Sequence, residues 1–184
     1  SDLGAGMRAI VSQRLLRARR EGLRDFGACM APMTAWQVLQ GIETLPVRME
    51  KHVANARRVV AFLREHPMVA SVSYPELPDH PDHALAQRLL PRGCGAVFPV
   101  NLRATREQGR RFIETLKLFS HLANVGDAKS LIIHPASTTH RQLDEAEQRA
   151  AGVTPEMIRL SVGLESLDDI LWDLDQALAR AEAA

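Results

Sequence analysis

The sequence predicts a two-layer α/β sandwich of four or five strands, with helices largely on one face. Two observations lead to this fold class. Short apolar runs with strand spacing alternate with amphipathic helical stretches, and an amphipathic helix closes the chain. A length of 184 residues is enough for one domain with a substantial core. The helices between the strands are short, so parallel and antiparallel pairings both remain open at this point.

The N-terminal stretch from Met7 to Arg24 predicts a basic helix with one apolar stripe. The stripe comprises Met7, Ile10, Val11 and Leu15, and the arginines are Arg8, Arg14, Arg17, Arg19, Arg20 and Arg24. A nucleic-acid-binding arm and a helix with a solvated or interface face are the two alternatives. The net charge is only +1 and no aromatic residues interleave with the arginines, which disfavours nucleic acid.

The spacing of apolar and turn-forming residues predicts the remaining elements. In order they are a break at 27–32, helices at 34–41 and 46–66, a strand at 69–74, a loop at 75–83, a helix at 83–90, a turn at 93–95, a strand at 96–102, a helix at 105–116, a strand at 130–133, a helix at 144–151, a strand at 157–163 and a closing helix after 166. Pro46 suits a first helical turn, Thr105 with Gln108 forms a capping box, and Ser166 caps the closing helix.

Polar residues cluster on both sides of the apolar run Ser130–Ile133. The turn-forming tetrad Asn124–Asp127 precedes this run. Pro135 ends it, because proline cannot donate to a strand ladder, and small polar residues follow as far as His140. This concentration of polar groups beside a buried strand makes the stretch from Leu118 to His140 the best candidate for a functional site.

The strand from Met157 to Gly163 adds one arginine to this candidate site. Alternation places Arg159 on one face together with Ser161 and Gly163, which are small enough to leave room beside the guanidinium. A planar fork of N–H donors suits a carboxylate held through two hydrogen bonds. The alternative is a solvated arginine on an open sheet face.

Other chemistries are disfavoured by the sequence. The metal-ligand candidates Asp79, His80, Asp82 and His83 lie in one loop without a further anchor. The hydrolase candidates His134, Ser137, His140 and Asp144 lack a nucleophile elbow. Cys29 and Cys94 match no zinc or disulfide spacing, so we expect a reducing, cytoplasmic setting, and no apolar run is long enough for a membrane span.

Three long segments, 22–56, 116–140 and 152–178, closely resemble the C-terminal part of O-acetylhomoserine sulfhydrylases. These enzymes belong to the pyridoxal-phosphate-dependent enzymes of cysteine and methionine metabolism, with cystathionine γ-synthase and methionine γ-lyase. The run GDAKSL, residues 126–131, points to the sulfhydrylase branch more firmly than HPAS or RLSVGLE does. The resemblance implies a small, mostly antiparallel sheet with helices, as in the C-terminal domain of fold-type I pyridoxal-phosphate-dependent transferases.

The resemblance also implies what the chain lacks. Family members are about twice as long, in keeping with two domains. Their cofactor lysine lies upstream of the position matching Ser1, and Lys51, Lys117 and Lys129 stand in other contexts. We therefore expect residues 1–30 to be the end of the cofactor domain and residues 31–184 to be the substrate-carboxylate domain. No cofactor, no metal and no catalytic residue is expected on this chain alone, and pyridoxal phosphate belongs to the full-length enzyme.

The resemblance assigns the substrate α-carboxylate to Arg159, with Asn124 beside it where relatives commonly carry serine. Ser130, His134 and Thr139 are read as supporting or structural residues. The implied reaction is γ-replacement on O-acetylhomoserine by sulfide or a thiol. The implied partners are the amino-acid substrate, the N-terminal cofactor domain and further copies in a homo-oligomer, a tetramer in the family, with no nucleic acid and no membrane. A non-catalytic binding or assembly module and a sister activity such as γ-synthase or γ-lyase stay open as alternatives.

Overall fold

A computed structural model describes residues 11–183 of the chain, which divides into two units, residues 1–44 and 45–184. In the first unit, residues 11–26 are helical, with a π-helical stretch η1 (Ala18–Leu23) followed by α2 (Arg24–Phe26). Gly27 ends this helix in the left-handed conformation. The predicted helix is thus confirmed from residue 11 onward, whereas Met7, Arg8 and Ile10 lie outside the described residues.

The helix α3 (Pro32–Glu43) completes the described part of the first unit and is longer than the predicted 34–41. None of residues 11–44 is buried, although many are apolar, including Phe26 and Trp36, which are 87% and 56% exposed. An uncovered apolar surface of this extent is typical of a segment that packs against another surface.

The second unit contains all four strands and five α-helices of the described residues from 45 onward. In order they are α4 (Leu45–Glu65), β1 (Val69–Val72), α5 (His83–Leu89), β2 (Val97–Leu102), α6 (Arg106–Thr115), β3 (Leu131–Ile133), the 3₁₀ turn η2 (Pro135–Ser137), α7 (Glu145–Ala150), β4 (Met157–Ser161) and α8 (Leu167–Glu182). Each predicted element from 46 onward is present, but the strands at 69–74 and 157–163 each end two residues early.

The four strands form one antiparallel sheet in the order β1-β2-β4-β3. The pairing that the residue pattern left open is therefore antiparallel throughout, as the family resemblance implied. β4 lies between β2 and β3, so that Arg159 is opposite Pro99 on one side and Ile133 on the other. An isolated parallel bridge between Ser120 and Leu131 extends the sheet beyond β3.

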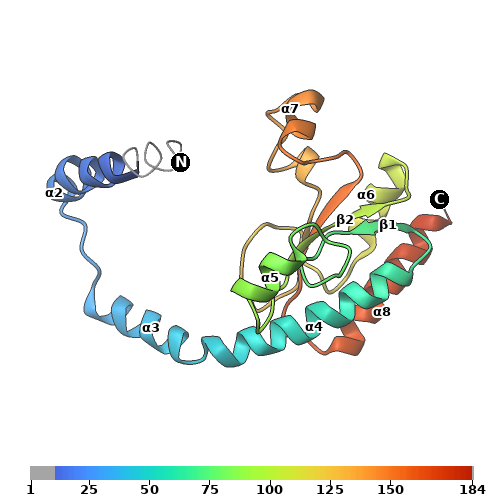
Figure 1. Ribbon diagram of the computed structural model, residues 1–184, viewed down its shortest axis with the longest axis horizontal. Coiled ribbons are helices and arrows are strands. Elements are labelled where there is room, and N and C mark those ends of the chain that lie inside the picture. The colour runs from blue at the N-terminus through green and yellow to red at the C-terminus, as the bar shows by residue number, and fades with distance from the viewer. Residues whose placement is uncertain (1–10, 184) are drawn as a thin grey trace. The chain divides into compact units, whose positions relative to one another are not determined.

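The core lies between this sheet and the three helices α4, α6 and α8 (Figure 1). Alternate residues of the central strands, such as Phe98, Val100, Ile158 and Leu160, point to these helices and are nearly inaccessible. The helical side of the core is supplied by Val59, Val60 and Leu63 of α4, Phe112 of α6, and Ile170, Leu174 and Leu178 of α8. The predicted two-layer sandwich with helices on one face is confirmed.

The ends of the helices agree with the predicted caps. Thr105 and Gln108 form the predicted capping box at α6, and Asp144 and Glu147 form another at α7. Ser166 is the N-cap residue of α8, as predicted, but its side chain makes no capping hydrogen bond. No helix of residues 11–183 combines the length and the apolar character that crossing a bilayer requires.

A buried carboxylate attaches the loop after α6 to the closing helix. Asp173 of α8 is 1% exposed, and its oxygens accept the backbone N–H groups of Lys117 at 2.9 Å and Leu118 at 2.8 Å. Gln176 donates to the same carboxylate at 3.0 Å. The charge of Asp173 is thus satisfied by fixed N–H donors, which holds the chain that leads from α6 toward β3.

Replacing Asp173 by asparagine should lower the free energy of unfolding by about 2–3 kcal/mol, because an amide NH₂ would face backbone donors and leave one of them unsatisfied. Urea denaturation of the 184-residue chain measures this change. Asp175→Asn, at an exposed position of the same helix, is the matched control and should change stability by less than about 0.5 kcal/mol. Equal effects of the two substitutions would contradict the structural role of Asp173.

Candidate functional site

Arg159 lies in the middle of β4, on the sheet face opposite the core. Its neighbours along the strand, Ile158 and Leu160, are both 2% exposed and point into the core, whereas Arg159 is half-buried. The apolar residues beside it on this face, Leu131 and Ile133 of β3, are nearly inaccessible. The guanidinium therefore stands in a shallow hollow with a buried apolar border on one side.

Gly163, just beyond the end of β4, is required because another backbone segment passes close to it, and not because a ligand does. A Cβ atom on Gly163 would lie 2.5 Å from the carbonyl oxygen of Ala128 and 2.5 Å from the carbonyl carbon of Lys129. The loop over residues 126–130 thus passes directly over Gly163. The predicted role of Gly163, to leave room beside Arg159, is corrected: its small size admits the backbone of this loop.

Four hydrogen bonds hold that loop against the end of β4. The hydroxyl of Ser130 donates to Glu165 at 2.9 Å and accepts from the N–H of Gly163 at 2.9 Å. The N–H of Ser130 donates to the other oxygen of Glu165 at 2.7 Å, and the N–H of Leu164 donates to Ala128 at 2.9 Å. Ser130 is completely buried, so its structural role, one of the two predicted alternatives, follows from these contacts.

The turn over Asn124–Asp127 is closed by its own side chains. The Asn124 amide donates to Asp127 at 3.1 Å, and its side-chain oxygen accepts from the N–H of Val125 at 2.8 Å. Gly126 supplies the left-handed conformation that the turn needs, with φ of 73°. The N–H of Lys129 and the Asn124 amide both bond to Asp127 and hold the pKa of its carboxyl below the usual value.

The structure brings Asn124 and Arg159 together through the backbone. A guanidinium N–H of Arg159 donates to the carbonyl oxygen of Asn124 over a long 3.4 Å, while the Asn124 side chain is occupied within its turn. Among residues 11–183, no carboxylate forms an ion pair with Arg159. A half-buried cation with one weak bond and unused donors can accept an anion with two oxygens in a plane.

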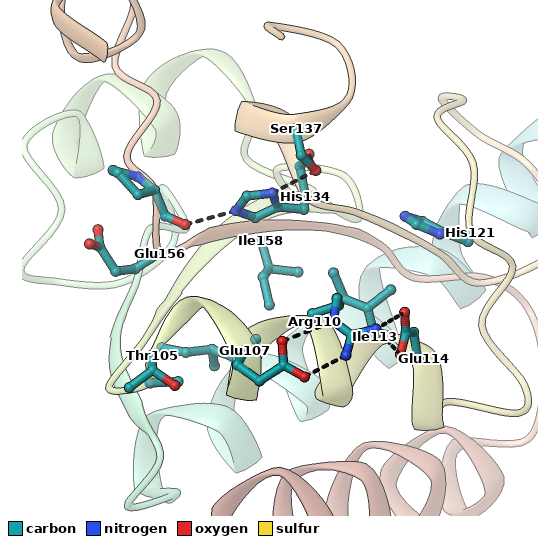
Figure 2. Close-up of a pocket in the computed structure, with 14 residues that line it drawn as sticks. Thr105, Glu107, Arg110, Ile113, Glu114, His121, His134, Ser137, Glu156 and Ile158 are labelled. Atoms are coloured by element: carbon teal, nitrogen blue, oxygen red, sulfur yellow. Dashed lines mark hydrogen bonds and ion pairs between the residues drawn. The ribbon is translucent and has the colours of Figure 1, made fainter. Parts of the chain in front are cut away.

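His134 and Ser137 form a local pair that stabilises the turn η2 (Figure 2). The Nε2–H of His134 donates to the carbonyl of Pro155 at 2.7 Å, so its Nδ1 accepts from the Ser137 hydroxyl at 2.8 Å. Asp144 is instead occupied as the cap of α7 and the imidazole of His140 contacts Thr139. Within residues 11–183, no carboxylate orients His134, so the four hydrolase candidates do not assemble into a triad.

The loop with Asp79, His80, Asp82 and His83 is tied down by ordinary contacts. Asp79 pairs with Arg64 at 3.1 Å, His80 accepts from the N–H of Asp82, and His83 bonds to the carbonyl of Pro75. Among the described residues, no group of three or more side chains of metal-binding type is gathered at one point.

Comparison with known proteins identifies the family. Residues 1–179 match the family described as Cys/Met metabolism PLP-dependent enzyme. The chain belongs to this family. It is similar to the O-acetyl-L-homoserine sulfhydrylase of Leptospira meyeri, with 53% identity over 89% of this chain and 37% of the relative. It is equally similar to O-acetyl-L-homoserine sulfhydrylase 1 of Thermus thermophilus, with 52% identity over 90% of this chain and 39% of the relative.

A solved structure supports the same family. An O-acetylhomoserine (thiol)-lyase structure from Campylobacter jejuni superimposes with a TM-score of 0.81 and 45% identity, covering 89% of this chain and 39% of that chain. That structure carries a pyridoxyl-lysine phosphate at its position 205. The present chain thus spans well under half of the length of these relatives.

The residues of this chain do not fit covalent attachment of the family's cofactor. Attachment needs a lysine amine within an enclosed site. Lys51, Lys117 and Lys129 are all exposed. The Nζ atom of Lys117 lies 5.9 Å from the centroid of the Trp172 ring. None of the three borders the hollow at Arg159.

Sequence reasoning missed Glu165 and the nature of the Asn124 contact. Glu165 stands in the motif RLSVGLE, just beyond the strand predicted at 157–163. Ser130 is the first residue of the strand predicted at 130–133. A serine and a carboxylate at neighbouring strand ends are a recognisable pair once the two strands are known to be adjacent. The contact through the Asn124 carbonyl has no sequence counterpart, because any residue offers a carbonyl.

Replacing Gly163 by alanine should displace the loop at 126–130 and lower the free energy of unfolding by about 2–4 kcal/mol, because the added Cβ meets backbone that cannot rotate away. Gly41→Ala in α3 is the control, since an added Cβ there meets nothing within 4 Å. Urea denaturation of both variants measures the difference. An unchanged stability of Gly163→Ala would mean that the loop does not need this close approach.

Proposed function

We propose that this chain is the substrate-carboxylate part of a pyridoxal-phosphate-dependent O-acetylhomoserine sulfhydrylase. In that enzyme Arg159 binds the α-carboxylate of the amino-acid substrate, and the remainder of a longer polypeptide supplies the cofactor and its lysine. The single observation that carries the proposal is the half-buried guanidinium of Arg159, which has a carbonyl partner at 3.4 Å and no ion-pair partner among residues 11–183.

The physical argument rests on the donors of Arg159. One N–H is directed to Asn124, which fixes the plane of the guanidinium, and the others remain available for a ligand. The buried side chains of Leu131 and Ile133 exclude water from one side of the hollow, which strengthens an ion pair formed there. A carboxylate held through two parallel hydrogen bonds is the anion that fits this geometry best.

The sulfhydrylase assignment is supported by the relatives. Two sulfhydrylases have 53% and 52% identity to this chain, and a protein named homocysteine synthase from Schizosaccharomyces pombe has 49%. The proposed reaction replaces the acetate on Cγ of O-acetylhomoserine by sulfide or methanethiol and gives homocysteine or methionine. Pyridoxal phosphate supplies the electron sink for this chemistry when it is bound in the assembled enzyme.

The chain has a restricted role in this scheme. Its residues bind and orient the substrate, and none of its exposed lysines is suited to the covalent step. We infer that the chain alone is inactive, that it works with the N-terminal cofactor part of the same enzyme, and that the enzyme is a homo-oligomer. The uncovered apolar residues of 11–44 are the surface on which such packing can occur.

Arg159→Ala, made in the polypeptide that joins this chain to the cofactor part, should weaken O-acetylhomoserine binding by about 2–5 kcal/mol, because the substrate carboxylate loses its partner. Arg159→Lys should recover only part of the loss, since an ammonium keeps the charge but not the fork. Steady-state kinetics gives KM, and the absorbance of bound pyridoxal phosphate should stay unchanged.

The matched control for this series is Arg180→Ala, an exposed arginine of α8. It should leave KM for O-acetylhomoserine unchanged. Normal substrate affinity in Arg159→Ala, or an equal loss of cofactor, would refute the assignment of Arg159 to the substrate carboxylate.

A further inference from the structure

The second unit contains a cavity of about 680 Å³ on the helix side of the sheet. Figure 2 shows α6 along one wall, with Glu107, Arg110 and Glu114, and the segments with His134 and Glu156 along the other. Between the walls lie apolar side chains that line the floor, namely Leu102, Ala104, Ile113 and Ile158. The volume is in the range of cavities that hold small organic ligands.

This cavity is separate from the Arg159 hollow. Ile158 lines the cavity and Arg159 follows it in β4, so strand alternation directs the two side chains to opposite faces of the sheet. The sheet itself stands between them. A ligand in this cavity therefore does not replace the substrate carboxylate, and the proposed function leaves the cavity unexplained.

The charge of the walls favours a cation. Among the lining side chains that the structure describes, three carboxylates, of Glu107, Glu114 and Glu156, and one guanidinium, of Arg110, give a formal charge of −2 with histidine counted as neutral. Among the side chains that the structure describes, Glu156 has no hydrogen-bond or ion-pair partner for its carboxylate. The carboxylate of Glu156 is thus free to pair with a ligand.

Arg110 does not make the cavity an anion site. Its Nε and Nη2 donate to Glu107, and its Nη1 donates to both oxygens of Glu114 at 2.8 and 3.0 Å. An anion would have to displace a carboxylate to reach these donors. The hydrogen bond from Arg110 lowers the pKa of Glu107, and the positive charge of Arg111 contributes to this shift. Arg111 is itself exposed and does not line the cavity.

A helix-interior glycine keeps the cavity wide. Gly109 lies in α6 and lines the cavity, and a Cβ added there would meet nothing within 4 Å. Its φ is not in the left-handed region, so neither the backbone nor the packing requires glycine at this position. Glycine is unfavourable within a helix relative to alanine. Its effect on the structure is to leave open the space that a side chain would fill.

We propose that this cavity binds a compact organic cation, with the ammonium group between the carboxylates of Glu156 and Glu107 and an apolar body against Ile113 and Ile158. The apolar floor provides the burial, and the excess of carboxylates selects the sign of the charge. The site stands independently of the substrate assignment at Arg159.

The test is a titration of the 184-residue chain with three probes of one shape. These are 2-phenylethylammonium, 2-phenylethanol and 3-phenylpropionate, which differ mainly in charge. The methyl resonances of isotope-labelled isoleucines report the site: Ile113 and Ile158 line it, whereas Ile132 and Ile170 are buried elsewhere in the core. The cation should shift Ile113 and Ile158 saturably and bind about tenfold more tightly than the anion.

Two substitutions separate binding from folding. Gly109→Leu should fill the cavity and abolish the shifts, while raising the melting temperature because leucine is the better helix former. Glu156→Gln should weaken the cation about three- to tenfold and leave 2-phenylethanol unchanged. Glu145→Gln, at an exposed position of α7 outside the cavity, is the matched control and should change neither.

The proposal is overturned by any of three results. The first is no saturable shift at Ile113 and Ile158 with the cation. The second is equal or tighter binding of 3-phenylpropionate, which would make the cavity an anion site. The third is undiminished binding of the cation in a folded Gly109→Leu chain, which would place the probe elsewhere.

Discussion

The close approach of the loop over residues 126–130 to Gly163 is the constraint on which the candidate site depends. A side chain at Gly163 would meet the backbone of Ala128 and Lys129, and the hydroxyl of Ser130 joins Gly163 to Glu165 at the same point. This contact fixes the loop that precedes β3 against the strand that carries Arg159. The Asn124 carbonyl consequently reaches the guanidinium, although 35 residues separate them in the sequence.

The alternation of β4 divides the molecule into two chemical environments. Ile158 and Leu160 belong to the apolar core shared with α4, α6 and α8, and Ile158 also borders the cavity, whereas Arg159 faces the opposite side among apolar residues of β3. A cation in the middle of a strand is rigidly placed here, because β4 pairs on one side with β2 and on the other with β3. Placement of this kind, rather than any unusual chemistry of the arginine, is what suits the site to an oriented carboxylate.

Most of the fold could be predicted from the sequence, because its causes are local. The capping box at Thr105, proline at the start of α4 and the alternation around Arg159 each act within a few residues. The antiparallel pairing could not be derived from pattern alone, since short helices permit either direction; the family resemblance implied it. The role of Gly163 was misread, because room for a ligand and room for a backbone look identical in a sequence. The cavity beside Gly109 also had no sequence signature, as it arises only when α6 packs beside β4.

The central claim is that this chain provides the carboxylate-binding arginine and not the cofactor lysine. The most direct measurement mixes the purified chain with pyridoxal phosphate, reduces it with borohydride, and determines the intact mass with and without O-acetylhomoserine. The account predicts no stoichiometric adduct, because Lys51, Lys117 and Lys129 are exposed and unenclosed. A single adduct at one lysine, blocked by the substrate and accompanied by turnover, would contradict it and show that the chain is a catalyst by itself.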